Sequence, residues 1–153
     1  MKGWRGPREP GERPTLGYTV LDWMTAHLPS PADESKPLVF TDEQALELLL
    51  WYTLDPISGR FIFRRASWEK AKGWGKSPFV AANSIAEFAG PVLFDGWDAD
   101  GEPVAKPWGF GEDPPPWVQI AAVSEDQTEN TYGAIYAYLT ANDHRAASDL
   151  GID

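Results

Sequence analysis

The fold-deciding stretch is residues 70–77, which read Lys70, Ala71, Lys72, Gly73, Trp74, Gly75, Lys76 and Ser77. Glycines let consecutive backbone N–H groups curl around an anion. Lys76 offers a point charge for the β- and γ-phosphates of a nucleotide, and Ser77 offers a hydroxyl for Mg²⁺. A helix is expected over residues 79–89, so its unpaired N–H groups would face the same point. The stretch therefore predicts a phosphate-binding loop.

The loop departs from the strict pattern GxxxxGK[ST] at one place, because Lys70 stands where the first glycine belongs. Pro78 is compatible with the motif, since proline is tolerated in the first helical turn. The preceding strand, expected over residues 66–70, is more polar than a central strand usually is. A flexible turn with a solvated lysine is the alternative interpretation.

Composition narrows the function classes. The 153 residues carry a formal net charge of −10 and no cysteine, which excludes disulfides and thiolate metal sites. A chain with this negative charge is a poor candidate for the main DNA-binding surface, because it repels the phosphate backbone of DNA. No apolar run approaches the length of a membrane span, and the N-terminus lacks the apolar region of a signal peptide. We expect no membrane partner.

Two regions are expected. Residues 1–37 read as a mobile, Gly- and Pro-rich arm and linker with a short helix at 18–27. Residues 38–153 read as the domain itself. Thr41 and Gln44 form a capping box that begins a helix, and strands are expected at 61–63 and 66–70.

The second half of the chain continues the alternation of strand and helix. Residues 90–116 read as an insertion with a hairpin around Asp100 and Gly101, and residues 117–123 as a buried parallel strand. A second capping box at 124–127 precedes a helical stripe, and residues 141–153 show no clear element. The stripe is formed by Tyr132, Ile135, Tyr136 and Leu139. The order predicts an α/β fold, a parallel sheet flanked by helices as in P-loop NTPases.

Three segments in order resemble the large subunit of the terminase of tailed double-stranded DNA phages. Residues 71–77 are similar to that family's deviant Walker A motif, which lacks the leading glycine. Residues 40–44 resemble the family's segment in which a glutamine contacts adenine. Residues 118–127 resemble the strand and glutamine-ended turn after the first helix. The Gly- and Asp-rich insertion is similar to that of actinobacterial phages. The resemblance implies the N-terminal ATPase part of a DNA-packaging motor.

The resemblance also implies site residues. Lys76 would hold the β- and γ-phosphates of ATP, and Ser77 would hold Mg²⁺. Gly73 and Gly75 would shape the anion nest, with Trp74 between them at the mouth of the site. Two further residues are implied. Gln44 would contact adenine, and Lys72 takes the place of an arginine that senses phosphate, although lysine lacks its planar fork.

By the same resemblance, the intact protein would use ATP hydrolysis to drive double-stranded DNA into the capsid. Its partners would be the portal protein and the terminase small subunit. It would act in the cytoplasm of the infected bacterial host and would not be a stable virion component.

Hydrolysis also needs a carboxylate at the end of a buried strand and a group that orients water. The only similar stretch, residues 92–95 ending in Asp95, lies inside the insertion and lacks a following acid, so we reject it. We expect the ATPase fold to be incomplete at its C-terminal side, the nuclease domain to be absent, and the chain alone to turn over little ATP.

Two rival functions remain open. One is a fragment of another P-loop NTPase or kinase; the other is a non-enzymatic interaction domain with a chance Gly-Lys-Ser. Weaker signals add no further site. Residues 98–101 suggest a calcium loop, but Gly96 and Pro107 stand where an EF-hand needs acids, so they read as a turn. His27 and His144 have no ligand spacing.

Overall fold

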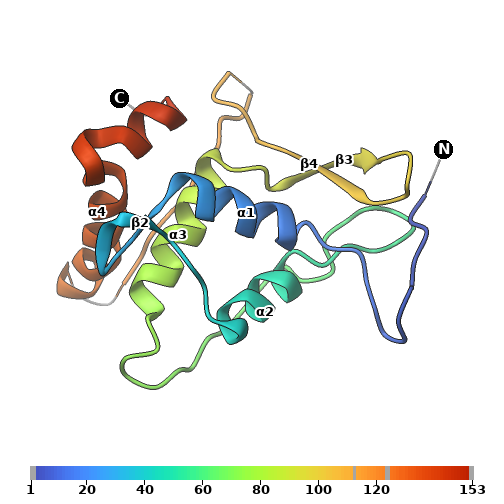
Figure 1. Ribbon diagram of the computed structural model, residues 1–153, viewed down its shortest axis with the longest axis horizontal. Coiled ribbons are helices and arrows are strands. Elements are labelled where there is room, and N and C mark those ends of the chain that lie inside the picture. The colour runs from blue at the N-terminus through green and yellow to red at the C-terminus, as the bar shows by residue number, and fades with distance from the viewer. Residues whose placement is uncertain (1–2, 112, 123–124, 152–153) are drawn as a thin grey trace.

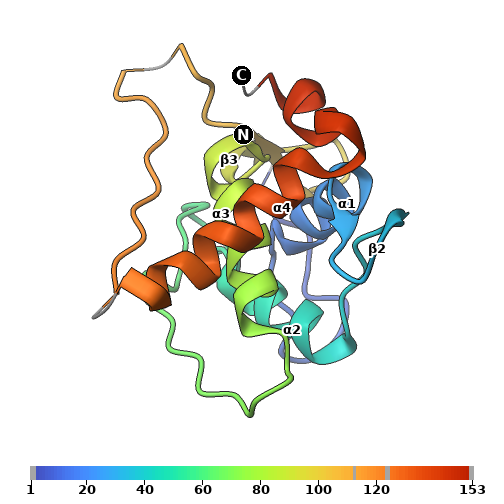
Figure 2. The ribbon, with the colours of Figure 1, turned by 90° about the vertical axis from the view of Figure 1, so that its left-hand side faces the viewer.

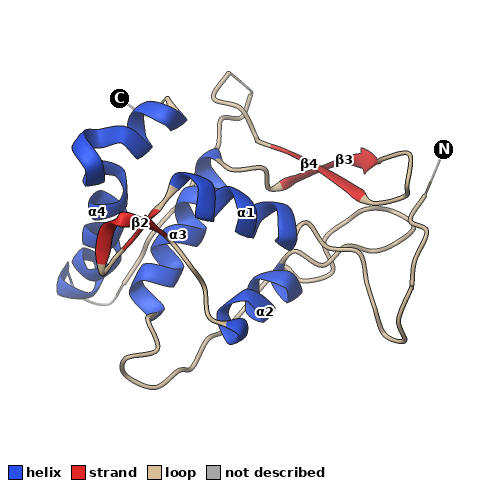
Figure 3. Ribbon diagram, viewed as in Figure 1, coloured by secondary structure: helices blue, strands red, loops and turns tan. Residues whose placement is uncertain are grey.

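The computed structural model describes residues 3–111, 113–122 and 125–151, and it shows a helical body with a hairpin and an N-terminal arm to one side (Figure 1). The helices are α1 (Gly17–His27), α2 (Asp42–Trp51), α3 (Lys76–Ala89) and α4 (Glu125–Leu150). The strands form two separate pairs, β1 (Pro29–Ser30) with β2 (Asp33–Pro37) and β3 (Leu93–Trp97) with β4 (Pro103–Lys106), and both pairs are antiparallel (Figure 3).

The capping box predicted for the second helix is confirmed. The hydroxyl of Thr41 accepts a hydrogen bond from the N–H of Gln44 at 3.2 Å, and the side chain of Gln44 accepts one from the N–H of Thr41 at 3.1 Å. The acids Asp42 and Glu43 in the first turn suit the positive end of the helix dipole. The predicted helices at 18–27 and 79–89 are also present, as α1 and α3.

The core lies among the helices. Buried apolar residues of α1, α2 and α3 form one cluster, which includes Val20, Met24, Leu48, Ala82 and Ile85. The helices α3 and α4 run side by side (Figure 2). Tyr138 of α4 is buried and donates a hydrogen bond to the carbonyl of Pro78 at 3.3 Å, which ties α4 to the beginning of α3.

Three strand predictions are wrong over the described residues. Residues 61–63 form only an isolated antiparallel bridge between Phe61 and Leu54, and residues 66–70 form none. Residues 117–122 belong to no strand, and Trp117 is 83% exposed. An apolar run becomes a strand only where a neighbouring strand forms hydrogen bonds with its N–H and C=O groups. No described segment pairs with residues 66–70 or 117–122 in this way. The parallel sheet stays a prediction.

Two further expectations are corrected. The segment read as a polar linker contains β1 and β2, and the tail after Ala141 continues α4 as far as Leu150. The predicted stripe on α4 is half right: Ile135 and Leu139 pack against the core, whereas Tyr132 and Tyr136 are exposed. Tyr138 and Ala141 are buried instead. Residue 124 of the second predicted capping box and residue 123 of the predicted strand lie outside the described residues.

The hairpin predicted in the insertion is confirmed, with its turn at 98–101. Asp98 accepts hydrogen bonds from the N–H groups of Asp100 and Glu102 at 2.8 and 2.9 Å, and Gly101 takes the left-handed conformation that the turn requires. The N-terminal arm lies against this hairpin, where Arg8 forms an ion pair with Glu102. Its mobility stays a prediction.

Candidate functional site: the glycine loop at the start of α3

The predicted phosphate loop is an open loop that ends in the first turn of α3. Gly73 and Gly75 both have a φ of 89°, in the left-handed region that favours glycine, and Gly75 is the N-cap of α3. Within the described residues, no group accepts a hydrogen bond from the N–H of Gly73, Gly75, Lys76 or Ser77. A Cβ added at Gly73 would meet no atom within 4 Å. The loop therefore presents free donors to solvent at the positive end of a helix.

The Lys76 side chain folds back across this loop. Its ammonium group donates a hydrogen bond of 2.8 Å to the carbonyl oxygen of Lys70, six residues earlier, and the contact is exposed. An exposed hydrogen bond to a neutral carbonyl contributes little stability. A phosphate can therefore compete for this ammonium group with a stronger, charge-assisted bond.

Gln44 links α2 to the loop. Besides completing the capping box, it donates a hydrogen bond from Nε2 to the carbonyl oxygen of Trp74 at 3.1 Å. The same amide nitrogen lies 3.3 Å from the position that a Cβ on Gly75 would take. Gln44 therefore lies at the glycine loop, and both ends of its amide are engaged. Its predicted contact with adenine stays a prediction.

The sequence did not predict a group of charged residues, Glu43, Glu47 and Lys70, that contacts the loop. Lys70 forms ion pairs with Glu43 at 2.7 Å and with Glu47 at 2.8 Å, and its own side chain is only 18% exposed. Trp74 donates from its indole to Glu43 at 2.9 Å, and Trp68 donates to Glu47 at 3.0 Å. The signal in the sequence was the i,i+4 spacing of Glu43 and Glu47, which places both on one face of α2.

These contacts shift two pKa values. The hydrogen bonds from Lys70 and Trp74 hold the pKa of Glu43 below its ordinary value of 4.5. The hydrogen bonds to Glu43 and Glu47 raise the pKa of Lys70 above its ordinary value of 10.5. Lys70 therefore stays charged and neutralises acids that would otherwise repel a phosphate.

Trp74 packs inward on one side. Its ring contacts Phe79 edge-on with centroids 5.1 Å apart, and the ammonium of Lys70 lies 5.0 Å from the Trp74 ring. Phe79 is buried and also contacts the rings of Phe40 and Trp68. This aromatic group anchors the loop to the core.

The remaining predicted site residues lie in the same loop. Lys72 is exposed and has no side-chain partner within the described residues. The hydroxyl of Ser77, at the first turn of α3, makes no hydrogen bond to the described part of the chain. Both are free to meet a ligand, and their roles as phosphate sensor and Mg²⁺ ligand stay predictions.

The acids that contact the described residues of this loop, Glu43 and Glu47, are both paired with Lys70. Asp95 of β3 forms an ion pair with Lys106 of β4 at 2.9 Å, so it serves the hairpin. Among the side chains that the structure describes, no group of three His, Asp or Glu could hold a metal ion. His27 contacts the Trp23 ring, with centroids 5.0 Å apart, and the His144 side chain lies outside the described residues.

Comparison with known proteins gives two relatives, both of phage origin. The chain is 38% identical to the Gene 13 protein of Mycobacterium phage L5 over 159 residues, which covers 91% of this chain and 25% of the relative. It is 34% identical to the Gene 13 protein of Mycobacterium phage D29 over 164 residues, which covers 94% of this chain and 26% of the relative.

The chain thus spans about a quarter of the length of the curated relatives it matches. No family model and no solved structure matches it. In the described part of the chain, no helix has both the length and the apolar character that crossing a membrane demands. The similarities support a phage protein, homologous to part of the Gene 13 proteins of mycobacteriophages.

Proposed function

We propose that this chain is the ATP-binding part of a phage terminase large subunit, and that the loop 70–77 binds the phosphates of Mg-ATP. The observation that carries the proposal is the loop itself. The loop has two left-handed glycines, four N–H groups without an acceptor among the described residues, and a Lys76 side chain held by one exposed hydrogen bond. Helix N-termini and glycine-rich loops of this kind bind phosphate.

The donor set fits a nucleotide polyphosphate. The N–H groups of Gly73, Gly75 and Lys76 would bind phosphate oxygens, and Lys76 would exchange the carbonyl of Lys70 for the β- and γ-phosphates. Ser77 would contribute its hydroxyl to Mg²⁺, which would neutralise the phosphate charge. Gln44 holds the Trp74 carbonyl and so fixes the loop in the conformation that presents these donors.

The comparisons support the phage origin that the proposal requires. Both relatives are phage proteins about four times as long as the aligned part. Their additional length leaves room for the strand that would carry the metal-binding carboxylate and for a nuclease domain. In the intact motor, ATP hydrolysis would drive double-stranded DNA into the capsid, with the portal protein and the small subunit as partners.

Calorimetric titration with Mg-ATP tests the proposal. Lys76→Ala should weaken binding by about 1–3 kcal/mol, the contribution of a charge-assisted hydrogen bond. The matched control is Lys36→Ala, which removes an exposed lysine of β2 that pairs with Asp33. Equal affinities for Lys76→Ala and the parent chain would favour the rival interpretation, a chance Gly-Lys-Ser in an interaction domain.

A further inference from the structure

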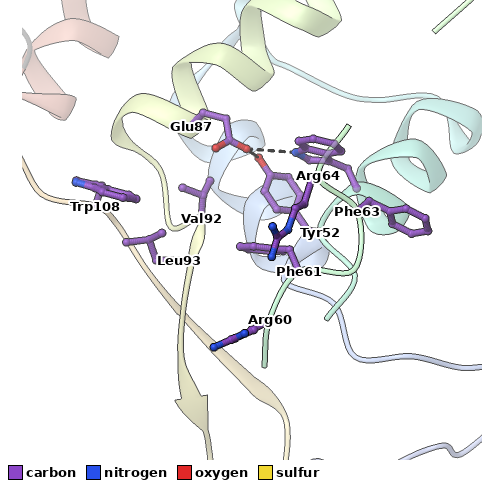
Figure 4. Close-up of a pocket in the computed structure, with 10 residues that line it drawn as sticks. Tyr52, Arg60, Phe61, Phe63, Arg64, Glu87, Val92, Leu93 and Trp108 are labelled. Carbon is purple, nitrogen blue, oxygen red and sulfur yellow. Dashed lines mark hydrogen bonds between the residues drawn. The ribbon is translucent and has the colours of Figure 1, made fainter. Parts of the chain in front are cut away.

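A second pocket lies at the opposite end of α2 and α3 from the glycine loop. It has a volume of about 470 Å³, within the range of roughly 300–1,000 Å³ typical of small-molecule sites. Most of its lining is aromatic or aliphatic, with Tyr52, Phe61, Val92 and Trp108 among the wall residues (Figure 4). Glu87 of this pocket is eleven residues after Lys76 in α3, or about 16 Å along the helix at 1.5 Å per residue. The two sites are therefore separate.

Two arginines line this pocket without a protein partner. The guanidinium groups of Arg60 and Arg64 make no hydrogen bond and no ion pair with the described residues, although the chain has 23 acids against 13 Lys and Arg. In the view of Figure 4, Arg60 lies at the lower end of the pocket and Glu87 at the upper end, with Arg64 between them. Unpaired guanidinium groups beside aromatic rings suit a ligand that is both planar and anionic.

Glu87 is held in a fixed orientation at the upper end. Its Oε1 accepts a hydrogen bond from the hydroxyl of Tyr52 at 2.7 Å and one from the indole of Trp51 at 3.3 Å. Burial, together with the charge of Glu87, raises the pKa of Tyr52 well above 10.0, so the hydroxyl remains a donor. The other oxygen, Oε2, has no partner among the described residues. It can accept a hydrogen bond from a ligand N–H.

We propose that this pocket binds one nucleotide, with its base among the aromatic rings, its phosphate on Arg60 and Arg64, and a base N–H on Oε2 of Glu87. Each part of the nucleotide matches one feature of the pocket. Aromatic rings stack on bases of any sequence, and guanidinium groups bind phosphate in a bidentate way. A carboxylate at the far end accepts from a base but repels a second anion. The nucleotide is either a free mononucleotide or one unit of a single strand.

Titration of the 153-residue chain with deoxyadenosine monophosphate, without Mg²⁺, tests the proposal by calorimetry. Arg60→Gln and Arg64→Gln should each weaken binding about tenfold, the effect of one lost charge-assisted contact. The matched control is Arg65→Gln, an arginine of the same segment that lines a different pocket. It should change the affinity less than about twofold. Lys76→Ala should behave like this control, because the glycine loop is a separate site.

Several outcomes would overturn the proposal. They are the absence of saturable binding, equal losses in Arg64→Gln and Arg65→Gln, loss of binding in Lys76→Ala, and equally tight binding of inorganic phosphate alone. The last result would show that the aromatic walls contribute nothing. Titration with a deoxyadenosine hexanucleotide distinguishes a free mononucleotide from one unit of a single strand as the ligand. Tighter binding of the hexanucleotide, with the same dependence on Arg60 and Arg64, supports a single strand, and weaker binding supports a free nucleotide.

Discussion

The side-chain amide of Gln44 donates a hydrogen bond to the backbone carbonyl of Trp74 at 3.1 Å, and this contact joins the first turn of α2 to the glycine loop before α3. The residues are thirty positions apart in the sequence. Because the Gln44 carbonyl also accepts from the N–H of Thr41, one side chain both begins a helix and holds the loop. A substitution can separate these two structural roles of Gln44.

Gln44→Glu should preserve the helix but release the loop. The carboxylate still accepts from the N–H of Thr41, whereas it cannot donate to the carbonyl of Trp74 and repels it instead. We expect helix content close to that of the parent chain and a several-fold loss of Mg-ATP affinity, on the order of 1 kcal/mol for one hydrogen bond. Circular dichroism and calorimetry measure the two effects. Unchanged affinity would show that this bond does not position the loop.

The contact between Glu43 and Lys70 should respond to pH. Because the folded-state pKa of Glu43 lies below its ordinary value of 4.5, the contact stabilises the fold above that value. The stabilisation is lost as the pH falls through the lowered pKa. The raised pKa of Lys70 works in the other direction, since its contribution is lost only as the pH rises beyond 10.5.

A carboxyl NMR titration of Glu43 tests this assignment. In Lys70→Met the midpoint should move up toward 4.5, because the hydrogen bond from Lys70 is the largest cause of the shift. The control Lys36→Met removes a lysine of β2 that pairs with Asp33 and should leave the midpoint unchanged. A midpoint that stays in place in Lys70→Met contradicts the ion pair.

Two helical glycines should respond in opposite directions to alanine. A Cβ at Gly17 of α1 would lie 2.7 Å from the Cα of Leu49, so the two helices would have to separate, at a cost of about 1–3 kcal/mol. A Cβ at Gly133 of α4 meets nothing within 4 Å, and alanine there should stabilise by roughly 0.5–1 kcal/mol. Urea unfolding compares the two variants. Stabilisation by Gly17→Ala would contradict the close packing of α1 on α2.

Tyr52 should contribute to stability through its hydroxyl. The hydroxyl donates to Glu87 at 2.7 Å and lies 3.0 Å from Oδ1 of Asn83, and the residue is buried. Tyr52→Phe should lower the free energy of unfolding by about 1–3 kcal/mol, the range for a hydrogen bond to a charged group. Tyr132→Phe, at a tyrosine that is 63% exposed, should stay within about 0.5 kcal/mol of the parent chain in the same urea experiment. Equal stability of the two variants would contradict this role.

The helices could be predicted because their signals are local. Thr41 and Gln44 mark the beginning of α2 whatever surrounds them, and the apolar positions of α3 repeat at helical spacing. The hairpin of β3 and β4 could be predicted too, because its turn is local. The strands expected at 61–63, 66–70 and 117–123 could not, because their pairing depends on segments far away in the sequence. Residues 117–122 are apolar enough for a buried strand, yet the described chain offers no neighbour to pair with them.

The candidate site also has parts that the sequence predicts and parts that depend on the fold. The loop and Gln44 could be found from their residue types and spacing. The ion pairs that Lys70 makes with Glu43 and Glu47 could not, since they depend on how residues 60–75 return to α2. Arg60 and Arg64 carried no motif, and only the fold places them in the lining of one pocket with Trp108.

The central claim is that the backbone N–H groups of the loop bind the phosphates of a nucleotide. An amide NMR titration of the chain with Mg-ATP tests it most directly. We predict saturable shifts for the amides of Gly73, Gly75, Lys76 and Ser77, and much weaker shifts in Lys76→Ala at the same ligand concentration. Shifts confined to other residues, or none at any concentration, would contradict it.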